Sequence, residues 1–166
     1  MEIKITINGL DRVQRAFARA PERMSKALRL AMLTVTRDIA DHAAHNHRFK
    51  SNRGKIEDSI EHKVTGSGDQ ITGTIELNPA LTMTRSGKGY GEYVHDGTPP
   101  HKIRPRDRKK LRWVDGGAFV FAGEVNHPGT DPDPFIYNAA DAIFSSGQAQ
   151  SAFDQQIDRA LQEVGG

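Results

Sequence analysis

Three histidines lie in one stretch of the chain and have the clearest capacity for chemistry. They are His95, His101 and His127, in three segments separated by turn residues. Neutral imidazoles from separate segments can hold a zinc ion and leave one coordination place open. The spacing does not favour this, because His95 and His101 are separated by two prolines and the three form no HxxxH or HxH pair. The sequence favours histidines whose ring nitrogens bond backbone groups of neighbouring turns, and it predicts no cofactor.

A run of cations is the second candidate site. Between positions 102 and 112 the basic residues are Lys102, Arg104, Arg106, Arg108, Lys109, Lys110 and Arg112. The first four alternate with other residues, so an extended chain would show them on one side. Such side chains can contact phosphates with a salt-dependent gain in affinity. Three interpretations stay open: a solvated loop, contact with an acidic face of a neighbouring subunit, and the lining of a channel through which DNA passes. Neither Phe nor Tyr is interleaved, so base stacking is not expected.

Familiar catalytic motifs are absent from the sequence. It contains no nucleophile elbow, no phosphate-cradling glycine loop and no HExxH. The paired acids Glu57 and Asp58 fall on a solvated segment. We therefore expect a protein that is not an enzyme, with a histidine-metal hydrolase as a remote alternative.

Composition predicts one domain over residues 1–166 with a thin core. Only 36% of the residues are hydrophobic and the mean hydropathy is -0.61, so much of the chain is expected on the surface or in an extended arm. The lack of cysteine excludes a disulfide scaffold and a thiolate metal site. The net charge of +2 does not indicate nucleic-acid binding. No apolar run is long enough to span a bilayer, and the alternating N-terminus predicts a strand and not a signal peptide, hence synthesis in the cytoplasm.

The elements expected in the first part of the chain are dominated by one long helix. Residues 2–7 alternate as a half-buried strand, and Asp11 caps a short helix that ends near residue 20. Pro21 suits the first turn of the next helix. Its apolar stripe consists of Met24, Leu28, Ala31, Val35, Ile39 and Ala43. The polar, basic segment 46–57 is expected to be a mobile loop.

The second part predicts strands, turns and a final helix. In chain order these are a hairpin over 60–77, a loop over 78–89, a short helix over 90–95 ended by Asp96-Gly97, strands over 111–114 and 119–126 joined at 115–117, and a helix from Pro134 with a weak point at 145–147. In the last strand Phe119, Phe121, Gly123 and Val125 share a face. The expected fold class is α+β: one antiparallel sheet of about five strands packed on the long helix, with a C-terminal helix beside it and long projecting loops.

Three blocks between Tyr90 and Phe135 carry a resemblance to a known family. The first holds Tyr90, Tyr93, Val94, His95, Gly97, Thr98, His101, Ile103, Arg104 and Pro105. The second holds Leu111, Arg112 and Trp113, and the third holds Val120, Phe121, Ala122, Val125, His127, Pro128, Gly129, Thr130, Pro134 and Phe135. In these blocks the chain resembles the head–tail joining and tail-completion proteins, or minor tail components, of tailed bacteriophages. Trp113 stands where the family usually has Phe, and Asp96 stands where the family often has Glu or Asn.

The resemblance implies a structural virion protein of a tailed phage or prophage, made in the bacterial cytoplasm. It would complete the tail or join head to tail at the neck as a homo-oligomeric, hexameric ring. Its partners would be itself, tail-terminator, tail-tube or head-connector proteins, and genomic DNA in passing, with no membrane. The signature residues expected to be structural are Tyr93, His95, Gly97, Thr98, His101, His127, Pro128, Gly129, Thr130, Pro134 and Phe135. Among them Pro128-Gly129 suits the centre of a type II turn, with Gly129 at positive φ. The alternative function is a DNA-binding accessory protein that uses residues 102–112.

Overall fold

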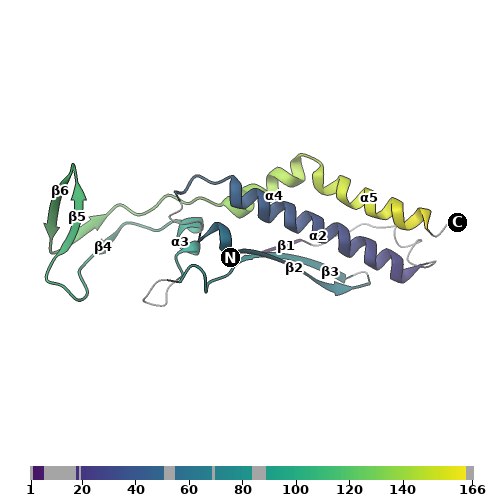
Figure 1. Cartoon of the computed structure of the whole chain (residues 1–166), viewed down its shortest axis with the longest axis horizontal. Coiled ribbons are helices and arrows are strands. Elements are labelled where there is room, and N and C mark those ends of the chain that lie inside the picture. Colours follow the sequence, from purple (N-terminus) through teal and green to yellow (C-terminus); the bar gives the residue numbers. More distant parts are fainter. Residues whose placement is uncertain are drawn as a thin grey trace.

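A long body and a thin arm that projects from one end of it make up the molecule (Figure 1). The computed structural model describes residues 2–5, 18, 20–50, 55–68, 70–83 and 89–163. Among these residues, the body contains three long helices and a three-stranded sheet, and the arm contains two short two-stranded sheets.

Helix α2 (Pro21–His45) is the axis of the body. It begins with the proline at its first turn and ends where the backbone and side-chain amides of Asn46 both donate to the carbonyl of His42, at 2.9 and 3.0 Å. Every residue of the predicted apolar stripe is buried, which confirms the stripe. One side of α2 faces the sheet, and another faces the two C-terminal helices.

The sheet pairs β1 (Glu2–Ile5), β3 (Gln70–Leu77) and β2 (Ile60–Ser67) in that order, all antiparallel. The hairpin predicted over 60–77 is confirmed. Gly73 faces the helix, and a Cβ there would lie 2.5 Å from Cγ2 of Thr36 and 2.8 Å from Sδ of Met32. Only glycine therefore permits this close approach of helix to strand. Positions 6–7 of the predicted first strand, and the short helix expected after Asp11 up to position 17, lie outside the described residues.

Helices α4 (Phe135–Ser145) and α5 (Gln148–Gln162) run back along α2. Phe135, Ile136, Ala139 and Ile143 of α4 are buried in the core. The helix predicted from Pro134 breaks at Ser146-Gly147, where Gly147 has φ 77°, so the predicted weak point is a true interruption.

In chain order, the arm comes after the 3-10 turn η1 (Glu57–Ser59), the hairpin and helix α3 (Gly91–Asp96). Helix α3 ends at Gly97, as predicted. Its strands are β4 (His101–Ile103), β5 (Leu111–Asp115), β6 (Ala118–Ala122) and β7 (Val125–His127). Strand β4 pairs with β7, and β5 pairs with β6 at the far tip. Of the predicted loop 78–89, positions 84–88 lie outside the described residues.

The α+β class is confirmed, but the strands do not form one sheet of about five. The described strands divide into one three-stranded and two two-stranded sheets. The strand predicted over 119–126 is in fact two strands, because the chain changes partner near Gly123: β6 folds back on β5, whereas β7 returns to β4. Phe119 and Phe121, expected on a shared face of one long strand, lie exposed on the tip hairpin.

Candidate interface on the projecting arm

Two chain segments are joined at the base of the arm by a pair of backbone hydrogen bonds. Thr98 and Thr130 exchange N–H···O bonds of 2.9 and 3.0 Å. Gly129 lies in the turn beside them with φ 96°, as predicted for this position. A Cβ on Gly129 would lie 2.2 Å from the carbonyl oxygen of Thr98 and 3.0 Å from the carbonyl carbon of Pro99. The turn and the facing segment are therefore in direct backbone contact.

His95 is a core residue at this base. It is 1% exposed and its ring packs edge-on against Phe135 and Tyr137, with centroids 5.3 and 5.2 Å apart. Its Nδ1 lies 2.6 Å from Oδ1 of Asp96. The ring links α3 to α4, and this fixes the direction in which the arm leaves the body.

His101 and His127 face each other across the β4–β7 ladder. Their rings stack with centroids 5.0 Å apart. Nδ1 of His101 is 2.9 Å from the carbonyl oxygen of Pro99, and Nδ1 of His127 accepts the N–H of Gly129 at 3.1 Å. The prediction that these rings bond backbone groups of neighbouring turns is confirmed for both. It is wrong for His95, whose Nδ1 lies against the carboxylate of Asp96 and not against a backbone group. Within the described ranges no group of three or more His, Cys, Asp or Glu side chains is arranged to hold a metal ion.

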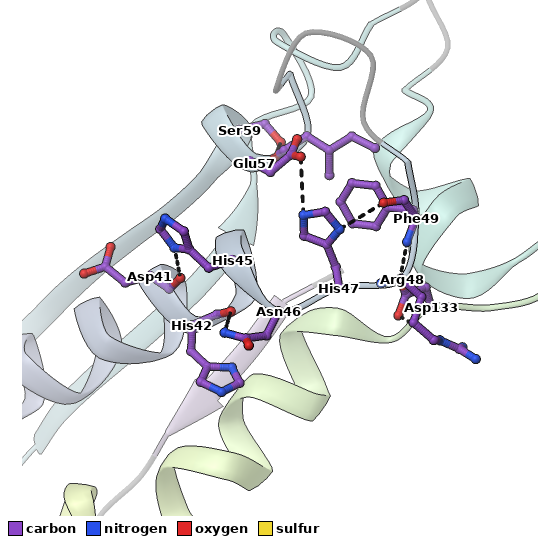
Figure 2. A network of polar contacts seen from close by, with 11 residues as sticks. Asp41, His42, His45, Asn46, His47, Arg48, Phe49, Glu57, Ser59 and Asp133 are labelled. Atoms are coloured by element: carbon purple, nitrogen blue, oxygen red, sulfur yellow. Dashed lines mark hydrogen bonds and ion pairs between the residues drawn. The ribbon is translucent and has the colours of Figure 1, made fainter.

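A buried aspartate ties the arm base to the end of α2, as Figure 2 shows. Oδ2 of Asp133 accepts the backbone N–H groups of Arg48 and Phe49 at 2.6 and 2.9 Å. The ring of Phe49 stacks on His47 at 3.8 Å, and Nε2 of His47 is 3.3 Å from Oε1 of Glu57. The Glu57 side chain is only 19% exposed, so of the two acids expected on a solvated segment only Asp58 is exposed. The described residues at both ends of segment 46–57 are thus anchored, contrary to the mobile loop expected, and positions 51–54 of that loop lie outside the described residues. The sequence does not predict this anchor, because an aspartate between two prolines is typical of an ordinary turn.

Asp133→Ala is expected to lower the free energy of unfolding by about 2 kcal/mol, because two partly buried backbone donors lose their acceptor. Denaturant unfolding measures this loss. Asp131→Ala is the matched control, since Asp131 is exposed two residues away. Equal stability of the two variants would show that the carboxylate does not hold the segment.

The first two cations of the basic run share one carboxylate. Nζ of Lys102 lies 2.8 Å from Oε1 of Glu124, and Nε of Arg104 lies 2.5 Å from its Oε2. Hydrogen bonds from Lys102 and then Arg104 lower the pKa of the Glu124 carboxyl below its usual value. Lys102 and Arg104 lie on one side, as their alternation predicted, but residues 106–110 form bends and not an extended strand, so the prediction does not hold through Arg106 and Arg108. The sequence does not predict that Glu124 pairs with these cations, because Glu124 lies outside the basic run and comes close through the pairing of β4 with β7.

The remaining cations are directed outward. The guanidinium of Arg112 lies 4.8 Å from the ring centroid of Phe119, a cation–π contact. The others are exposed and make no ion pair with any residue that the structure describes: Arg106, Arg108, Lys109 and Lys110. Three of these four cations line a shallow hollow beside the hairpin, together with Pro105 and Phe121: Arg106, Arg108 and Lys110.

The tip hairpin carries large apolar side chains in solvent. Cross-strand register pairs Arg112 with Phe121 and Val114 with Phe119, so these four residues share one face, which we call the tip face. Val114, Phe119 and Phe121 are 60%, 61% and 57% exposed. An isolated two-stranded hairpin is marginally stable in water, and an exposed cluster of this kind marks an interaction site.

Comparisons of the chain with protein families, with curated proteins and with solved structures found no match. In the parts of the chain that the structure describes, no helix combines the length and the apolar character needed to cross a membrane.

Proposed function

We propose that this protein is a structural component of a tailed phage or prophage that completes the tail or joins it to the head at the neck. It acts by binding, as a homo-oligomeric ring, and performs no catalysis. The sequence blocks between Tyr90 and Phe135 support this through their resemblance to the family. The observation that carries the proposal is the arm, whose tip face combines apolar and cationic side chains that no described part of the chain covers.

Five of the signature residues support a structural role by their position, whereas Tyr93, His101 and Pro128 are exposed. His95, Thr98, Gly129, Thr130 and Phe135 all lie at the base of the arm and fix how it leaves the body. A ring subunit needs such a joint, because the arm must reach a neighbouring subunit in a defined direction.

A DNA-binding accessory protein is the second candidate. The unpaired cations of the run favour it, because each can contact a phosphate. Phosphate binding leaves the exposed Val114, Phe119 and Phe121 without a role, so a protein partner explains more of the arm.

The location of this chain in purified phage particles tests the proposal. A tagged copy of the chain, expressed during prophage induction, should be found by gold labelling at the head–tail junction in several copies per particle. A chain that is missing from purified particles would overturn the proposal. Duplex-DNA affinity of the free monomer that falls steeply with salt would then favour the accessory protein.

A further inference from the structure

Two exposed apolar stripes on the body could receive the tip face. The first lies on α4 and consists of Tyr137, Asp141 and Phe144, spaced i, i+4, i+7 and therefore on one side of the helix. The second lies on α2 and contains Leu30 and Leu33. Both stripes present large exposed side chains, so apolar character alone does not choose between them.

The charged residues beside the apolar ones differ between the α2 and α4 stripes. The α2 stripe continues into Lys26, which would repel the cations of the arm, and into Arg37, whose charge is offset by Asp38 at 3.1 Å. The α4 stripe holds Asp141, which is exposed and has no ion pair among the described residues. Of these two stripes, the one on α4 combines apolar surface with an acid that has no described partner.

The charge difference extends beyond single residues. The arm, residues 101–127, has seven basic and three acidic residues, 7 − 3 = +4. Residues 131–163, which include α4 and α5, have one basic and six acidic residues, 1 − 6 = −5. Complementary potentials of this kind steer two surfaces together and fix their register.

The tip cannot reach the α4 stripe of its own chain. In Figure 1 the β5–β6 hairpin lies at the far end of the arm, whereas α4 lies in the body on the other side of the arm base. The Thr98–Thr130 bonds and the His95 ring hold the arm base in the orientation that directs the tip away from α4. A contact between the two surfaces must join different molecules.

We propose that the tip face of one copy docks on the α4 stripe of the next. Val114, Phe119 and Phe121 would meet Tyr137 and Phe144, while cations of the arm approach Asp141. The two surfaces differ, so the contact is head-to-tail and generates a closed ring or a filament. This inference deepens the proposed function and rests on it for the ring.

Disulfide trapping tests the contact, because the chain has no cysteine of its own. Purified full-length Val114→Cys and Ser145→Cys are mixed and oxidised with diamide. Both positions are exposed and leave the aromatic side chains intact. A disulfide requires the Cα atoms to approach within about 7 Å. We expect a covalent heterodimer at about tenfold the yield of the control mixture, Val114→Cys with Leu30→Cys on α2.

Asp141→Lys in the Ser145→Cys background should reduce the yield about tenfold. Equal yields in the α4 and control mixtures would overturn the inference. The particle test above is separate: trapping without localisation at the neck retains the contact and removes the phage assignment. Localisation without trapping retains the phage assignment and removes this contact.

Discussion

Gly129→Ala is expected to lower the free energy of unfolding by about 3 kcal/mol. Alanine at φ 96° costs about 1 kcal/mol in backbone strain. Its Cβ would also lie 2.2 Å from the carbonyl oxygen of Thr98, so the two segments must separate. Separation breaks the paired Thr98–Thr130 bonds, each of which contributes about 1 kcal/mol. Denaturant unfolding gives the total loss, and hydrogen exchange at these two amides shows where it arises.

Gly117→Ala is the matched control. Gly117 also has positive φ, 83°, but a Cβ there would have no atom within 4 Å. We expect only the strain, about 1 kcal/mol. If the two variants lose the same stability, the contact across the arm base contributes nothing and the resemblance in this motif has no structural basis here.

Local patterns predicted the body well. The six-residue apolar stripe of α2 depends only on helical spacing, and the stripe is buried as expected. The 60–77 hairpin follows from alternation and a glycine turn. Positive φ at Gly97 and Gly129 follows from turn chemistry, which is also local.

The arm was predicted less well because its pairing is nonlocal. Alternation continues from Phe119 through Gly123 to Val125, so the sequence does not show that the chain changes partner there. The sequence of an apolar stripe is the same whether the stripe packs in a core or binds another molecule. Alternation therefore predicts that Phe119 and Phe121 share a strand face, but it does not predict that they are exposed.

The candidate interface was only partly visible in the sequence. The basic run was evident from its composition. Its division into paired cations, Lys102 and Arg104, and unpaired ones depends on Glu124, which the β4–β7 pairing brings close. The sequence does not predict the α4 stripe, because no motif distinguishes Tyr137 and Phe144 from the other apolar residues of this amphipathic helix.

The largest functional effect is expected from reversing the unpaired cations. In the variant Arg106→Glu, Arg108→Glu, Lys110→Glu the isolated protein should keep its circular dichroism spectrum and melting temperature, because exposed charges without described partners contribute little to stability. Infectious titre in a complementation assay should fall by about 100-fold or more, because like charges at an interface cost several kcal/mol. Arg104 is left unchanged, since its reversal would disturb Glu124 within the arm.

The control carries the same change of charge on exposed lysines elsewhere: Lys26→Glu, Lys50→Glu, Lys55→Glu. It should support near-normal titres, which separates a local requirement from a general effect of net charge. Folded arm variants that give tails without heads would support a protein interface. Joined particles that fail to eject DNA would support a channel lining. Normal titres would show that the run is a solvated loop, and the cations would then have no part in how copies of this chain meet.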